Sequence, residues 1–450
     1  MASANSFGYK EQLNRTLSLK DLVLFGLLFM NPIAGLTFFG LMAVVSEGNA
    51  ISSYVVAFVA VIFTALSYEK MVEAFPIAGS SYSYARHALG KIAGFFAGWT
   101  MLMDYLLIPV LSTVLGSLYL QAIFPSIPLW IMMLSMVTIM TVVNIIGIEF
   151  GSKFNIAMFG VLSVAIIVFI IFSMYYVITK DHLSILGFTP IINLETFAIS
   201  PVMSAASIAV LCYLGFDAIT TLTEETKVAP KQIGKGIMIA CLIQTLLFII
   251  LTSISMAVVK DFTLIKNPDI ALSEILLTIS TPMIHLIFTM TLFVAALTTA
   301  LTSQTAGSRV MFAMGRDNMF PKKFFSYVHK KYKTPIYSIL LIGVVNVILS
   351  FTLGLTLLSE LVAFGGICGF ILVNLATMVH FHKLEQRSIL RTYIFPGLGA
   401  ITCAYIIASM ASLTLIVGFS WIVVGMIVVT IQLNLNKASV PTDEVPELVN

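Results

Sequence analysis

Charged residues are scarce in this chain of 450 residues. Only 10% are Asp, Glu, Lys or Arg, whereas 59% are hydrophobic and the mean hydropathy is +1.02. Soluble domains carry about 25% charged residues, so this composition excludes an ordinary soluble protein. The sequence predicts an all-α polytopic membrane protein, whose expected partners include the lipid bilayer and not nucleic acid.

Several chemical motifs are also missing. The chain has no Gly-x-x-x-x-Gly-Lys-[Ser/Thr] phosphate loop, which removes ATP as a direct energy source. It has no His–Asp pair or Cys–His set at membrane depth, and its cysteines form no Cys-x-x-Cys pair. We therefore expect no metal, no cofactor, no disulfide and no enzymatic activity. The four cysteines all lie inside apolar runs: Cys212, Cys241, Cys368 and Cys403.

Long apolar runs fill the rest of the chain. About 20 apolar residues cross roughly 30 Å of hydrocarbon. We expect a tail at 1–20 with no cleaved leader, one transmembrane domain at 21–435, and a second tail at 436–450. The twelve expected spans lie near 21–45, 51–72, 92–121, 128–147, 154–178, 200–222, 236–258, 284–312, 336–353, 358–379, 393–413 and 415–435.

Basic residues predict the orientation. With the N-terminus inside, all but three of the 24 Lys and Arg fall on the inner side, as the positive-inside rule requires. We expect a plasma-membrane protein with both ends cytoplasmic; the inner basic clusters are a topology signal or a contact for anionic lipid. The outer acidic residues are a vestibule that attracts cations, or are merely tolerated: Glu47, Asp181, Glu195, Asp261, Asp269, Glu274 and Glu360.

Two apolar runs are interrupted in the middle, at 31–35 and at 212–217. Proline, glycine and a carboxylate persist at bilayer depth only where the freed polar groups face protein, water or a ligand. The first span runs outward and the sixth inward, which is typical of an inverted repeat. The repeats would cover about 21–178 and 200–379, with two further helices at about 393–435. A plain proline kink is the alternative for the first break. The interrupted residues are Asn31, Pro32, Ile33, Ala34 and Gly35, and Cys212, Tyr213, Leu214, Gly215, Phe216 and Asp217.

Two further groups of polar residues lie inside spans. Asp104 and Tyr105 precede Pro109, which has no N–H for the carbonyl of Tyr105, so an ammonium group could use all three acceptors. Asp104 could equally bond a neighbouring helix. In the eighth span, hydroxyl residues form either a sodium site or ordinary bonds to their own helix: Thr298, Thr299, Thr302 and Ser303.

Three segments carry a family resemblance: 75–84 (FPIAGSSYSY), 214–226 (LGFDAITTLTEET) and 308–317 (SRVMFAMGRD). With them, the chain resembles the amino acid–polyamine–organocation transporter superfamily over essentially its whole length. Within that superfamily it is most similar to bacterial putrescine importers, through 104–106, 215–226 and 314–321.

The resemblance implies a five-plus-five inverted-repeat, leucine-transporter-like fold that works by alternating access. It implies a pocket formed by the two breaks, Asp104 and Tyr105, with Phe364 and Gly365 of the tenth span. Three departures limit the transfer. Amino acid transporters of this kind usually have Gly-x-Gly in the first helix, which 34–36 lacks. Some putrescine importers have an acid near Thr37, and some relatives have a coupling lysine where this chain has Ser163.

These observations predict a secondary active importer of a small amine-bearing solute, either a putrescine-like polyamine or an amino acid. The expected driving force is the proton gradient, with sodium possible. An amine-binding channel or sensor is the alternative from another class. The sequence leaves monomer and homo-oligomer open.

Overall fold

The computed structural model describes residues 17–76, 80–147, 152–181, 196–316, 320–332, 334–384 and 388–438, and it is helical throughout these ranges apart from short connections. The α-helices of the first half are α1 Leu19–Phe29, α2 Ala34–Thr37, α3 Phe39–Val45, α4 Ala50–Ala74, α5 Ser80–Leu89, α6 Lys91–Ile123, α7 Leu129–Ile146 and α8 Ser152–Asp181. Those of the second half are α9 Ile199–Tyr213, α10 Pro230–Val259, α11 Ala271–Ile279, α12 Pro282–Arg316, α13 Lys322–Phe325, α14 Ile336–Thr352, α15 Leu355–Lys383, α16 Phe395–Ala408 and α17 Ser412–Ala438. Three 3₁₀ segments, η2 Asp217–Glu225, η3 Phe262–Leu264 and η4 Pro268–Ile270, and one π segment, η5 Leu390–Ile394, complete the set.

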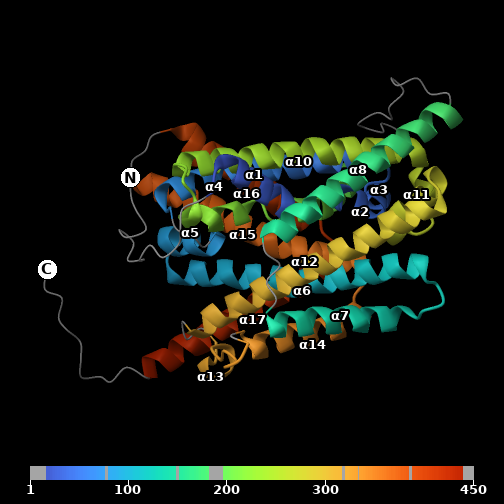
Figure 1. Ribbon diagram of the computed structural model, residues 1–450. Helices are drawn as coiled ribbons and strands as arrows, with labels where there is room; N and C mark the ends of the chain where they lie inside the picture. Colours follow the sequence, from blue (N-terminus) through green and yellow to red (C-terminus); the bar gives the residue numbers. More distant parts are fainter. Residues whose placement is uncertain are drawn as a thin grey trace, which may run out of the picture.

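Membrane-crossing length is reached by most of the long helices. Among the described residues, eleven helical segments are long and apolar enough to cross a membrane, and α14 is a shorter apolar helix of 17 residues. At 1.5 Å per residue, α14 extends about 26 Å. The expectation of an all-α polytopic membrane protein is therefore confirmed. Figure 1 shows the long helices running along one common direction, with α5 and α13 at the left end of the bundle and α11 at the right.

Buried amides connect helices that are distant in sequence. The side chain of Asn374 on α15 donates to Thr64 Oγ1 of α4 at 3.0 Å and accepts from Ser67 Oγ of α4 at 2.6 Å. On another side of the bundle, Asn144 of α7 donates to Gln304 Oε1 of α12 at 2.7 Å. Lipid tails give no hydrophobic drive between helices, so such interhelical bonds and close packing stabilise the bundle.

A pair of tryptophans connects α17 to α6. The rings of Trp99 and Trp421 stack with centroids 4.6 Å apart. Each indole N–H donates to the backbone carbonyl of the other residue, at 2.8 and 3.1 Å. Gly425 lies against Trp99, where a Cβ would come within 2.7 Å of the indole. This contact holds the last helix against α6, which also carries Asp104.

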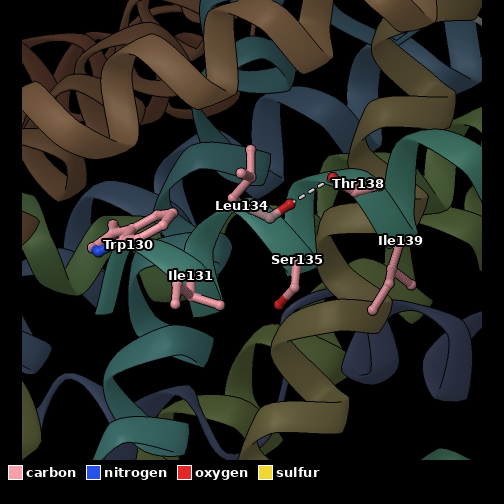
Figure 2. A pocket seen from close by; sticks show the side chains of 6 residues that line it. All are labelled: Trp130, Ile131, Leu134, Ser135, Thr138 and Ile139. Carbon is pink, nitrogen blue, oxygen red and sulfur yellow. Dashed lines mark hydrogen bonds between the residues drawn. The ribbon is translucent and has the colours of Figure 1, made fainter. Parts of the chain in front are cut away.

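The outward face of α7 is apolar. Trp130, Ile131, Leu134 and Ile139 are exposed and line a shallow surface hollow (Figure 2). Between them, Thr138 donates its hydroxyl proton to the carbonyl of Leu134 on the same helix. Because the hydroxyl of Thr138 is bonded within its own helix, this face is suited to contact lipid.

The outer acidic residues differ from expectation at one position. Glu360 is buried, and its carboxylate accepts from the hydroxyl of Thr414 and from the N–H of Ala411 at 3.2 Å, next to the start of α17. A carboxylate is favourable at a helix N-terminus, so Glu360 caps α17 and does not belong to a vestibule. In the connection after α10, the Thr263 N–H lowers the pKa of Asp261, and burial raises the pKa of Asp269. The side chains of Asp181 and Glu195 lie outside the described residues.

Replacing Asn374 tests the role of the buried amides. Asn374→Leu removes two interhelical hydrogen bonds. Thr64 then retains the carbonyl of Ala60 and the sulfur of Cys403, and Ser67 retains the carbonyl of Phe63. We expect the free energy of unfolding in detergent to fall by about 0.6–1.7 kcal/mol per lost bond. The matched control is Thr402→Val, since Thr402 bonds its own helix at Leu398. Equal midpoints of thermal unfolding for the two variants would contradict this role.

Candidate functional site at the two helix breaks

The first break separates α1 from α2. The α1 helix ends at Phe29, and Asn31 adopts a left-handed conformation with φ of 52° before Pro32. Asparagine tolerates this conformation better than most residues, and proline has no N–H to continue the helix. The chain resumes a helix at Ala34, whose N–H donates to the carbonyl of Asn31 at 2.9 Å.

The second break separates α9 from η2. The α9 helix ends at Tyr213, Gly215 has a φ of 116°, and the chain continues as a 3₁₀ helix from Asp217 to Glu225. Only glycine adopts such a φ without strain. Runs of 3₁₀ helix longer than about four residues are uncommon and mark strained or functional segments.

The two breaks touch each other. A Cβ on Gly215 would lie 2.4 Å from Cδ1 of Phe29 and 3.1 Å from its carbonyl carbon, so the second break passes directly over the end of α1. On another side, Gly366 of α15 makes room for the side chain of Leu214. The second break therefore lies against the end of α1, with α15 beside it.

Asp217 is fixed by a hydroxyl group. Ser80, the first residue of α5, donates from Oγ to Asp217 Oδ2 at 2.8 Å. Ser80 itself has a φ of 49°, a conformation that costs an ordinary residue free energy. The contact connects the second break to α5 and orients one oxygen of the carboxylate.

Asp104 faces the same region from α6. Its Oδ1 is buried and has no hydrogen-bond partner. Two successive glycines of α15 contact both segments: Gly365 lies against the backbone of Asp104, and Gly366 lies against Leu214, three residues before Asp217. Neither carboxyl group forms an ion pair within the described ranges, where the ion pair found is Lys70–Glu73 at 3.5 Å. Both residues are half-buried, and two carboxylates removed in part from water without a counter-ion are unfavourable until a proton or a cation joins them.

Neighbouring helices approach this carboxyl pair closely. Gly365 of α15 lies so near α6 that a Cβ would come 2.9 Å from the carbonyl of Thr100 and 3.6 Å from the N of Asp104. Gly307 of α12 lies against Tyr105 in the same way, because a Cβ on Gly307 would come 3.0 Å from the Cβ of Tyr105. Small residues thus allow α6, α12 and α15 to pack around one point.

Four of the expected residues point elsewhere or are used in packing. Phe216 is fully buried and packs against Tyr68 and Phe370, with ring centroids at 5.5 and 5.0 Å. Tyr213 donates to Thr245 at 2.9 Å. The remaining two are Cys212, whose sulfur lies 3.9 Å from the hydroxyl of Tyr54, and Phe364, which packs against Phe419 of α17.

The coupling candidates use their hydroxyl protons within their own helices. Ser163 donates to Phe159, Thr298 to Val294, Thr299 to Ala295 and Thr302 to Thr298, all at 2.8–3.0 Å. Ser303 is buried. Of the residues that the structure describes, no group of three His, Cys, Asp or Glu could hold a metal ion.

One polar residue at the breaks was not among the expected ones. Gln244 of α10 is fully buried, and its Nε2 donates to the carbonyl of Asn31 at 3.4 Å. The first break packs on the same helix, because Gly35 leaves space for the ring of Phe248, one turn further along. An amide in the middle of the apolar run 236–258 was the available signal, since polar residues at that depth are usually functional.

A membrane bundle with two touching helix breaks, and with two carboxyl groups that have no cation partner among the described residues, suits the binding of a solute. A family model for amino acid permeases matches residues 23–437. The chain belongs to this family, and hence to the amino acid–polyamine–organocation superfamily, and it is not an enzyme.

Relatives of the chain include several bacterial transporters. It is 31% identical to the low-affinity putrescine importer PlaP of Escherichia coli (strain K12), over 92% of this chain and 93% of that protein. It is 26% identical to the branched-chain amino acid permease BcaP of Bacillus subtilis (strain 168), over 93% of each chain. A methylthioribose transporter of the same Bacillus subtilis strain is also 26% identical, over 93% of each chain.

Gly215 is the position where the second break tolerates least change. In Gly215→Ala, the new Cβ meets Phe29 at 2.4 Å and the φ of 116° becomes strained. We expect stability in detergent to fall by about 1–3 kcal/mol. The matched control is Gly397→Ala in α16, where a Cβ meets nothing within 4 Å. If both variants melt at the wild-type temperature, the contact between the breaks is not formed as described.

Proposed function

We propose that this permease is a secondary active importer of a small amine, with putrescine-like diamines as its substrates. It acts at the plasma membrane with both termini cytoplasmic, and the proton gradient drives it. The observation that carries the proposal is the pair of half-buried carboxyl groups, Asp104 and Asp217, which lie on segments that both contact α15 and which have no cation partner among the described residues. An ammonium group supplies the missing charge and up to three hydrogen-bond donors.

The free acceptors favour a cation at this point. Ser80 occupies Oδ2 of Asp217, while Oδ1 of Asp104 has no partner. An ammonium group placed between the two carboxyls pairs with both and satisfies that buried oxygen, which offsets the cost of burying the charges.

An amino acid substrate is the second candidate, because BcaP transports branched-chain amino acids according to its name. Its α-carboxylate would need donors in the first break. There, three of the five positions 31–35 offer no free N–H, because Pro32 has none and those of Asn31 and Ala34 already bond the carbonyls of Leu28 and Asn31. A substrate carboxylate beside Asp104 and Asp217 would also be repelled. These two features favour the diamine.

The connection between the breaks supports the proposal of alternating access. At the end of η2, Thr226 pairs with Leu17 in a parallel bridge, and the N–H of Lys227 donates to the carbonyl of Leu17 at 3.0 Å. The start of α1 and the end of η2 therefore move together. Binding of an ammonium group at Asp217 draws η2 toward α6, and release on the cytoplasmic side requires this joined pair to swing away from α5 and α10.

The first test replaces one carboxylate. In Asp217→Asn, the ammonium group loses a charged acceptor, and we expect kcat/KM for putrescine uptake into proteoliposomes to fall about tenfold or more. Asp261→Asn, in the outer connection, is the control for a general change of charge. Wild-type uptake kinetics in a folded Asp217→Asn protein would refute the assigned role.

The second test concerns the energy source. We expect an inward proton gradient to concentrate putrescine in proteoliposomes above its external level, and a sodium gradient to leave uptake unchanged. Accumulation that needs sodium would overturn the choice of ion. Equilibration without accumulation under either gradient would indicate a channel or a sensor.

A further inference from the structure

We infer that Gln244, together with the side chain of Asn31, forms a second subsite that holds the far ammonium group of a diamine. This inference rests on the proposed function and extends it, because the carboxyl pair provides for only one of the two charged ends. Neither residue carries a charge, so the subsite is an acceptor site made of amide oxygens.

The hydrogen bonding of Gln244 determines which of its atoms is free. A backbone carbonyl can only accept, so the amide nitrogen of Gln244 must face the carbonyl of Asn31, 3.4 Å away. Its Oε1 therefore points away from that bond, and this oxygen is buried without a partner. The orientation of the amide thus follows from its bonding.

Asn31 presents a second free oxygen at the same break. Its Oδ1 is also buried and has no partner. The left-handed backbone of Asn31 and the bond from Gln244 place both side chains at the turn between α1 and α2. Two residues in contact thus each carry a buried unsatisfied acceptor, and such acceptors call for a donor.

The end of α1 connects this subsite to the carboxyl pair. Gly215, two residues before Asp217, lies against Phe29 at the end of α1. Gln244 bonds the carbonyl of Asn31, two residues after Phe29. Both subsites therefore lie at the end of α1, and a short linear diamine is the kind of ligand that suits them. An ammonium group accepts neutral oxygen ligands as well as charged ones, though it binds them less strongly.

Competition between two amines tests the subsite. Uptake of putrescine into proteoliposomes is measured together with inhibition by n-butylamine, which has one ammonium group. In Gln244→Leu, we expect the KM for putrescine to rise about tenfold while the inhibition constant of n-butylamine stays unchanged. In Gln244→Glu, which adds a charge at the same place, we expect the KM for putrescine to fall. Thr252→Val, which removes another buried unpartnered oxygen of α10, is the control and should leave both values unchanged.

The outcomes separate this inference from the proposed function. If putrescine is neither transported nor bound by the wild type, both fail. If the wild type transports putrescine but Gln244→Leu weakens both amines equally or neither, the second subsite is wrong and the carboxyl pair stands. If Gln244→Leu removes only a dependence on sodium, the two amide oxygens hold that ion and the inference is overturned. Unchanged putrescine kinetics in Gln244→Glu, which retains the shape of the side chain, would also overturn it.

Discussion

Backbone and carboxyl groups at bilayer depth must find partners, because no water is available there to replace a missing hydrogen bond. This constraint governs the centre of the molecule. The helix ends at Phe29 and Tyr213 are covered by each other, as the contact of Gly215 with Phe29 shows. The glycines of α12 and α15 let neighbouring helices close around them. Among the described buried polar atoms without a partner are acceptor oxygens of Asp104, Asn31 and Gln244. These three lie at the first break and on α6 and α10, and they define the kind of ligand that completes the site.

Much of the fold could be predicted from the sequence because each signal is local. Runs of apolar residues give the spans, and proline and glycine interrupt helices wherever they occur. The two breaks and the helical polytopic class were therefore predictable. The position of Asp104 within a span was also evident, because a carboxylate in an apolar run stands out.

The direction of individual side chains was less predictable, since it depends on helix packing between distant segments. Phe364 follows the rotation of α15 and packs against α17, while Phe216 packs against Tyr68 and Phe370. Glu360 appeared to be an outer acidic residue, yet it caps α17 through Ala411 and Thr414. The sequence shows Gln244 only as an amide in an apolar run, and its position at the site depends on the packing of α10 against the first break.

A structure with putrescine bound tests the central claim most directly. The account predicts one ammonium group within hydrogen-bond distance of the carboxyl oxygens of Asp104 and Asp217, with the carbon chain extending toward the first break. A diamine bound elsewhere, or an ammonium group beyond hydrogen-bond distance of both carboxyl groups, would contradict it.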